Sequence, residues 1–84
     1  MKAIRLSQHA KEQAEHRGCT EEEINSAIKT ASWQKGELGR LECRKDFVFN
    51  NSWNDNKYLT KQVRPVFVEE KNEIIVITVY VYYF

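Results

Sequence analysis

The stretch that decides the fold closes the chain: residues 74–84, with the sequence IIVITVYVYYF. Every residue in it is β-branched or aromatic, which favours a buried strand, and 11 residues are too few to span a membrane as a helix. Because side chains alternate along a strand, one face should hold Ile75, Ile77, Val79, Val81 and Tyr83. The other face should hold Ile74, Val76, Thr78, Tyr80, Tyr82 and Phe84. We expect the aliphatic first face in the core, and a site on the second face with its row of hydroxyls.

This strand should lie inside a sheet or at a covered edge, because an exposed apolar strand recruits other chains. The whole chain, residues 1–84, predicts a single domain with one small core. Hydrophobic residues make up 42% and charged residues 30%, the proportions of an ordinary globular protein. The net charge of +1 excludes the strong overall basic field of many nucleic-acid binders, although a local basic cleft is compatible with it. The first residues show no signal peptide, so we expect a cytoplasmic protein that does not associate with membranes.

Upstream, the chain predicts a short strand over 3–6 and two helices. Ser7 is a suitable N-cap for a helix over 8–17. A second helix should begin after Thr20, which forms a capping box with Glu23. Its expected buried stripe has helical spacing and consists of Ile24, Ala27, Ile28 and Ala31.

Downstream, alternating segments predict two more strands before the last one. They are expected over 40–49 and 57–69, with a loop at 34–39, a turn at 50–56 and a tight hairpin turn at 70–73. Pro65 lies inside the second of these strands and predicts a bulge or an edge position there. Helices followed by strands indicate an α+β fold, with two helices on one face of a three-stranded antiparallel meander.

The polar face of this meander could bind phosphate or RNA. It should present Arg40, Glu42, Arg44, Gln62, Arg64, Thr78, Tyr80 and Tyr82. Guanidinium groups pair with phosphate oxygens in a bidentate manner, and tyrosine rings stack on bases. His9 should lie in the first turn of its helix, where the positive helix dipole favours a neutral imidazole. A neutral imidazole can accept the proton of a ribose 2′-OH, although a simple structural role for His9 is the competing interpretation.

Metal and cofactor sites are weakly indicated. His16 and Cys19 form a His-x-x-Cys pair that Cys43 could join, but a second closely spaced ligand pair is missing from the sequence. We therefore expect no metal and no cofactor, and expect both cysteines to be reduced and structural. The sequence also lacks a Gly-rich phosphate loop and the motifs of serine hydrolases and zinc proteases.

Three segments together resemble a known family: 6–10 (LSQHA), 15–24 (EHRGCTEEEI) and 74–80 (IIVITVY). They are similar to a family of small bacterial domains of unknown function that is grouped with the BrnT-like and RelE-like toxins of toxin–antitoxin systems. The resemblance implies a RelE/barnase-like fold, RNA cleavage without a metal, and a cognate antitoxin as partner. It also implies catalytic or RNA-facing roles for His9, Arg17, Thr78 and Tyr80. The strand faces add Arg44 and Arg64 as phosphate-binding residues and Tyr82 beside them.

Two alternatives to a toxin-like endoribonuclease remain open. The chain could be a non-catalytic interaction module that pairs with another protein, or with a second copy of itself, through the exposed strand end at 80–84. It could also bind RNA without cleaving it.

Overall fold

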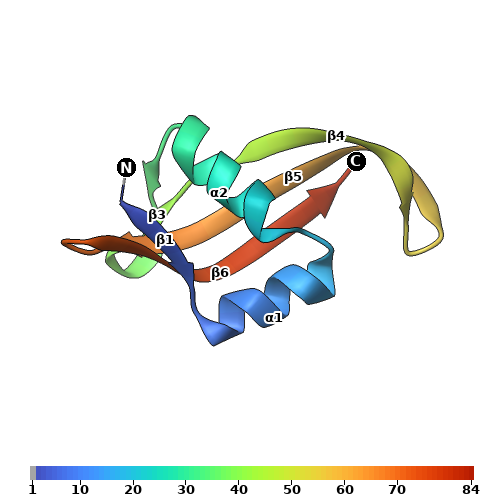
Figure 1. Cartoon of the computed structure of the whole chain (residues 1–84). Helices are drawn as coiled ribbons and strands as arrows, with labels where there is room; N and C mark the ends of the chain where they lie inside the picture. The colour runs from blue at the N-terminus through green and yellow to red at the C-terminus, as the bar shows by residue number, and fades with distance from the viewer. Residues whose placement is uncertain (1) are drawn as a thin grey trace.

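The computed structural model describes residues 2–84 and confirms an α+β architecture with an N-terminal strand followed by two helices (Figure 1). The elements in chain order are β1 (Ala3–Leu6), α1 (Gln8–Arg17), α2 (Glu21–Thr30), β2 (Gln34–Lys35), the 3-10 helix η1 (Glu37–Gly39), β3 (Leu41–Glu42), β4 (Lys45–Trp53), β5 (Asn56–Glu69) and β6 (Glu73–Tyr83). The strands form one mixed sheet in the order β1-β6-β5-β3-β2, and β4 pairs with β5 beyond β3. Over residues 2–84 the sheet thus has six strands, more than the predicted three-stranded meander and the short N-terminal strand together.

Strand β6 lies inside the sheet, as its composition predicts, and the free part of its edge is covered. Strand β1 runs parallel to it, with Leu6 opposite Val76, and so makes the sheet mixed. Where β1 ends, α1 takes over the edge: the backbone N–H of Ser7 donates to the Val76 carbonyl at 3.0 Å. At the other end of α1, Arg17 Nη1 donates to the Val79 carbonyl at 3.1 Å. The edge is therefore covered by hydrogen bonds from a helix.

A bulge in β6 corrects the predicted faces of this strand. Val66 of β5 pairs with Thr78, but the next β5 residue pairs with Val76, so Ile77 has no partner across the ladder. An extra residue reverses the alternation of side chains. Val79 is buried as predicted, whereas Ile74 is buried before the bulge in place of Ile75. The predicted faces are right after the bulge and wrong before it.

Pro65 divides the predicted strand 40–49 into β3 and β4. The pairing of Glu42 with Val66 and of Lys45 with Val63 keeps one register across the gap. Between them the N–H of Cys43 donates to the Pro65 carbonyl at 3.4 Å, while proline has no N–H to return the bond. The interruption thus has a chemical cause, and the backbone continues in the same direction.

The polar segment predicted as a turn over 50–56 is mostly strand. Strand β4 continues to Trp53, which pairs with Asn56, so the turn contains only Asn54 and Asp55. Both have positive φ, 52° and 67°, a conformation that Asn and Asp tolerate and that two-residue hairpins require. Asn50, at φ 44°, lies in a bulge that bends β4. The predicted loop at 34–39 likewise contains β2 and η1.

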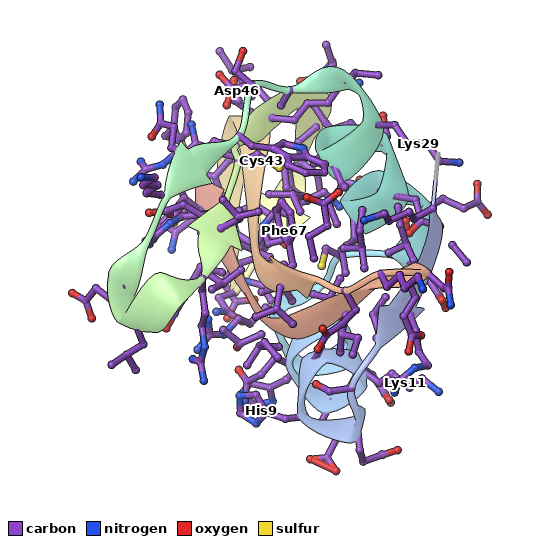
Figure 2. The ribbon with its side chains drawn as sticks, turned by 90° about the vertical axis from the view of Figure 1, so that its left-hand side faces the viewer. His9, Lys11, Lys29, Cys43, Asp46 and Phe67 are labelled. Atoms are coloured by element: carbon purple, nitrogen blue, oxygen red, sulfur yellow. The ribbon has the colours of Figure 1, made fainter. Side chains whose placement is uncertain are left out.

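The helix caps agree with the sequence, and Ile24, Ala27 and Ile28 of the predicted stripe are buried, whereas Ala31 is only partly buried. Ser7 accepts a hydrogen bond from the N–H of Ala10, Gly18 ends α1 at φ 80°, and Thr20 and Glu23 form the expected capping box. Both helices cover the same face of the sheet (Figure 2). The residues buried between the layers are Leu6, Ala10, Ala14, Cys19, Ile24, Ala27, Ile28, Cys43, Val63, Phe67, Ile74, Val76 and Val79.

The two cysteines belong to this core and are not bonded to each other. Burial raises the pKa of Cys19 and of Cys43 to about 11, so both thiols stay protonated at neutral pH. Within residues 2–84 no group of three or more His, Cys, Asp or Glu side chains is arranged to hold a metal ion. No helix in the same range is long and apolar enough to cross a membrane.

Candidate functional site

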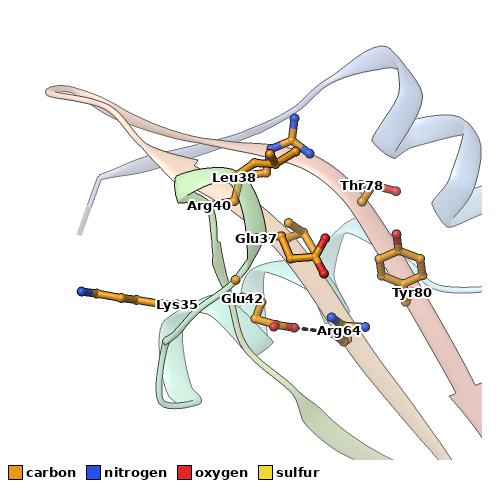
Figure 3. Close-up of a pocket in the computed structure, with 10 residues that line it drawn as sticks. Lys35, Glu37, Leu38, Arg40, Glu42, Arg64, Thr78 and Tyr80 are labelled. Carbon is orange, nitrogen blue, oxygen red and sulfur yellow. Dashed lines mark hydrogen bonds and ion pairs between the residues drawn. The ribbon is translucent and has the colours of Figure 1, made fainter.

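A cavity of about 530 Å³ lies on the face of the sheet opposite the helices. The segment β2–η1–β3 folds over this open face and forms one wall, while β5 and β6 form the floor (Figure 2 and Figure 3). The lining residues come from all of these elements and are Lys35, Gly36, Glu37, Leu38, Arg40, Glu42, Arg64, Val66, Thr78 and Tyr80. The bulge in β6 is what directs the last two of them toward the cavity.

The wall of the cavity is built by a short hairpin with two left-handed residues. Strands β2 and β3 pair through Gln34 and Glu42, and the N–H of Gly36 donates to the Arg40 carbonyl at 2.8 Å. Between them the chain turns through Leu38, at φ 58°, and Gly39, at φ 73°. Glycine adopts such φ values without strain, which explains its place in this loop.

Arg64 is the central charged group of the cavity floor. Its Nε pairs with the Glu42 carboxylate, its Nη1 donates to the Tyr82 hydroxyl at 3.0 Å, and its guanidinium carbon lies 5.0 Å from the Tyr80 ring centroid. The hydrogen bond from Arg64 holds the pKa of Glu42 below its usual range. The same contact raises the pKa of Arg64. Both groups therefore stay ionised at neutral pH.

Arg17 approaches the same tyrosine from the other side of β6. Its guanidinium carbon also lies 5.0 Å from the Tyr80 ring centroid, while Nη1 is fixed on the Val79 carbonyl. The Tyr80 ring is thus in contact with two guanidinium groups, one from α1 and one from β5. Tyr80 and Arg17 also line a second cavity of about 280 Å³, together with His16 and Trp53.

The structure brings most of the predicted site residues together. Arg64, Thr78 and Tyr80 line the larger cavity, and Tyr82 and Arg17 contact two of these residues directly. Two predicted residues, His9 and Arg44, are exposed and do not line it.

His9 lies two residues after the N-cap of α1, and this N-cap is hydrogen-bonded to β6 next to a residue that lines the cavity. Ser7, the N-cap, donates through Oγ to the Ile77 carbonyl at 3.0 Å, and Thr78 follows directly in the chain. Figure 2 shows His9 on the side of α1 that faces the open face of the sheet. The first turn of α1 is therefore tied beside the cavity, with the imidazole free in solvent. Arg44 projects from the gap between β3 and β4, and its charge contributes to the lowered pKa of Glu42.

Sequence reasoning missed the wall of the cavity. The sequence predicts Glu42 on the polar face but gives it no role, and it predicts a loop for the segment that contains Lys35 and Glu37. Two glycines, Gly36 and Gly39, flanking charged residues were the available signal, because such a pattern allows a tight hairpin that projects charges. The position of that hairpin over the open face depends on β3 pairing with β5, which a local pattern does not reveal.

The cavity combines cations with aromatic and hydroxyl groups. Lys35, Arg40 and Arg64 are its cations, and Glu37 and Glu42 its anions, with Arg17 adding a further charge beside Tyr80. Guanidinium groups next to a tyrosine ring suit a ligand with both an anionic group and a planar apolar one. A nucleotide unit has both features.

Comparison with protein-family models, with curated proteins and with solved structures found no match to this chain.

Proposed function

We propose that the protein is a toxin-like endoribonuclease that binds RNA in the cavity on the open face and cleaves it without a metal ion. The observation that supports this is the convergence of Arg17 and Arg64 on Tyr80, with Thr78 and Tyr82 beside them. Guanidinium groups held in place before a ligand arrives favour the charge of a pentacoordinate phosphate. The resemblance to RelE-like and BrnT-like toxins supports the same assignment and a RelE/barnase-like fold.

In the proposed reaction the substrate supplies its own nucleophile. His9 accepts the proton of the ribose 2′-OH, and the 2′ oxygen attacks the adjacent phosphorus. The bond from phosphorus to the 5′ oxygen breaks, that oxygen takes a proton from solvent, and a 2′,3′-cyclic phosphate remains. Arg64 and the hydroxyls of Thr78 and Tyr80 hold the phosphate oxygens, while Arg17, Arg44 and Tyr82 bind the rest of the strand.

Bacterial growth under induced expression tests this proposal. Wild-type protein expressed in the cytoplasm should arrest the growth of the bacteria. It should also fragment their RNA to products with cyclic phosphate ends. His9→Ala should abolish cleavage but retain RNA binding, because His9 is exposed and its loss leaves the fold intact. Co-expression of a cognate antitoxin should restore growth. If purified wild-type protein cuts no RNA under any condition, the proposal of an endoribonuclease is wrong.

A second candidate is a protein-interaction module. Large apolar side chains are exposed on the part of the sheet farthest from β1, with Val48 at 94%, Leu59 at 68% and Phe84 at 57% exposure. Exposed apolar clusters often mark protein interfaces. This function predicts a concentration-dependent dimer or a stable complex with a protein partner, and no effect of His9→Ala. Sedimentation of the wild type and of His9→Ala at high micromolar concentration separates the two candidates.

A further inference from the structure

We propose that the substrate is single-stranded RNA, and that two unpaired bases next to the bound phosphate stack on Tyr82 and Phe84. This inference rests on the proposed function, since it names the substrate class of the same site. It starts from an aromatic row, defined as Tyr80, Tyr82 and Phe84, that leads out of the cavity along β6. The row is on the open face, because the three residues alternate with Val79, Val81 and Tyr83 on the helix face.

The first member of the row differs from the other two. Tyr80 lies 5.0 Å from two guanidinium carbons, so its surroundings suit a phosphate. The Tyr82 hydroxyl accepts a hydrogen bond from Arg64 at 3.0 Å, and Tyr82 is 39% exposed. Phe84 is 57% exposed. Tyr80 is 37% exposed, about as much as Tyr82, so the exposed aromatic surface increases at Phe84, while the guanidinium charge lies at the Tyr80 end of the row.

The spacing of the row selects unpaired bases. Alternate residues of a strand are roughly 6.8 Å apart. Consecutive bases in a duplex strand are separated by only about 3.4 Å, half of that distance. Consecutive rings can therefore hold consecutive bases only if those bases have been separated from each other, which a duplex does not allow. Stacking on aromatic side chains accepts any base, so little sequence preference is expected from this part of the site.

Phe84 pairs with Thr60 of β5, and exposed apolar side chains lie on the strands beyond it. Its carbonyl accepts a hydrogen bond from the N–H of Leu59 at 3.2 Å, and Val48 projects from β4 on the same face. Nearer the cavity, Gln62 Nε2 donates to the Asp46 carboxylate at 2.8 Å, so this carboxylate has a partner. A base can lie flat on such a surface, whereas a phosphate would find no positive charge to pair with on the side chains named.

Binding of short oligonucleotides tests the inference. The probes are a dinucleotide and a hexanucleotide, which has two extra bases on either side of the same central step. Both have a 2′-deoxy sugar at that step to prevent cleavage. The longer single strand should bind at least about thirtyfold more tightly than the dinucleotide, since each of the two stacked bases contributes. Hybridising it to a complement should remove that gain. Phe84→Ala should remove most of the gain as well, and Phe84→Leu should remove less.

The matched control is Lys71→Ala, which removes an exposed side chain in the turn between β5 and β6, at the opposite end of β6. It should bind both oligonucleotides as the wild type does. Equal affinity for both lengths, or a duplex bound as well as the single strand, would overturn the inference while leaving RNA cleavage intact. Phe84→Ala that weakens self-association and leaves RNA affinity unchanged would assign this surface to a protein interface. Failure to bind any oligonucleotide would instead overturn the proposed function.

Discussion

Replacing Glu42 by glutamine should release Arg64 while leaving the shape of the cavity unchanged. The Glu42 carboxylate pairs with Arg64 Nε, and the two side chains are 16% and 24% exposed. An amide has nearly the same size but no charge, so Arg64 would keep its contact with Tyr82 and lose its counter-ion. Comparing this variant with the wild type therefore tests whether Arg64 can bind a phosphate.

The expected loss of stability follows from how far the pair is shielded from water. Fully exposed pairs contribute about 0–1 kcal/mol, and hydrogen bonds to charged groups about 1.5–3 kcal/mol. With both side chains mostly but not fully covered, Glu42→Gln should lower the free energy of unfolding by about 1–2 kcal/mol. For a chain of this size the melting temperature should fall by roughly 5–15 °C.

The pH dependence of this loss has a defined sign. Because Arg64 lowers the pKa of Glu42 below its ordinary value of 4.5, the pair stabilises the folded state fully above that pH. The contribution disappears as the pH falls through the lowered pKa. The difference in melting temperature between the wild type and Glu42→Gln should therefore shrink below pH 4.5. A constant difference from pH 7 to pH 3 would contradict this explanation.

Glu42→Gln should strengthen RNA binding, although it lowers the stability of the fold. A guanidinium freed from its carboxylate can neutralise one more phosphate, and the slope of log K against log salt for a single strand should steepen by about 0.7. Fluorescence anisotropy with an uncleavable oligonucleotide from 50 to 300 mM salt, about the range in which such contacts weaken, measures this slope. The control is Glu69→Gln, which breaks the ion pair with Lys2 in a different part of the sheet. Equal slopes for the wild type and both variants would show that the Glu42 charge does not limit phosphate binding by Arg64.

Three further predictions concern the scaffold. Gly18→Ala should destabilise the protein by more than about 1 kcal/mol, because Gly18 has φ 80° and a Cβ there would lie 2.5 Å from the Trp53 ring; a urea midpoint equal to that of the wild type would contradict this. Phe67→Ala should cost about 3–5 kcal/mol, since this ring is fully buried, and a loss under 1 kcal/mol in the same titration would show that the core repacks. Cys19 and Cys43 should react slowly with a thiol reagent at pH 8 and rapidly in denaturant. Because their folded pKa of about 11 exceeds the ordinary 9.0, stability should fall from pH 9 to pH 11, and fast labelling of the folded protein would refute their burial.

The sequence predicted those features that depend on neighbouring residues. The caps at Ser7 and Thr20 satisfy backbone donors within the next turn, and the stripe of α2 follows helical spacing, so both can be recognised locally. The same holds for the alternation along β5, in which buried and partly exposed residues follow each other from Lys61 to Val68. These features need no knowledge of what lies across the sheet.

The features that were missed depend on pairing between distant segments. The bulge at Ile77 exists because β5 pairs with different registers on either side of it, and residues 74–84 contain no local mark of that change. Pro65 itself indicates an irregularity in β5. The sequence does not show that this irregularity interrupts the strand paired with it and divides that strand into β3 and β4. The site residue Glu42 was assigned to the correct face and given no role, because its pairing with Arg64 follows from the register of β3 on β5.

The bulge at Ile77 links the fold to the site. Before it, Ile74 and Val76 point into the core; an unbroken alternation from there would bury Thr78, Tyr80 and Tyr82 as well. The extra residue turns these hydroxyls to the open face and returns Val79 to the core. The Ile77 carbonyl accepts a hydrogen bond from Ser7 Oγ, which fixes the N-cap of α1 next to Thr78 in β6. One inserted residue thus exposes the cavity floor and positions the helix that carries the proposed base. For this reason a change at the bulge should affect RNA binding and cleavage together, as should a change at Arg64, whereas a change at His9 should affect cleavage alone.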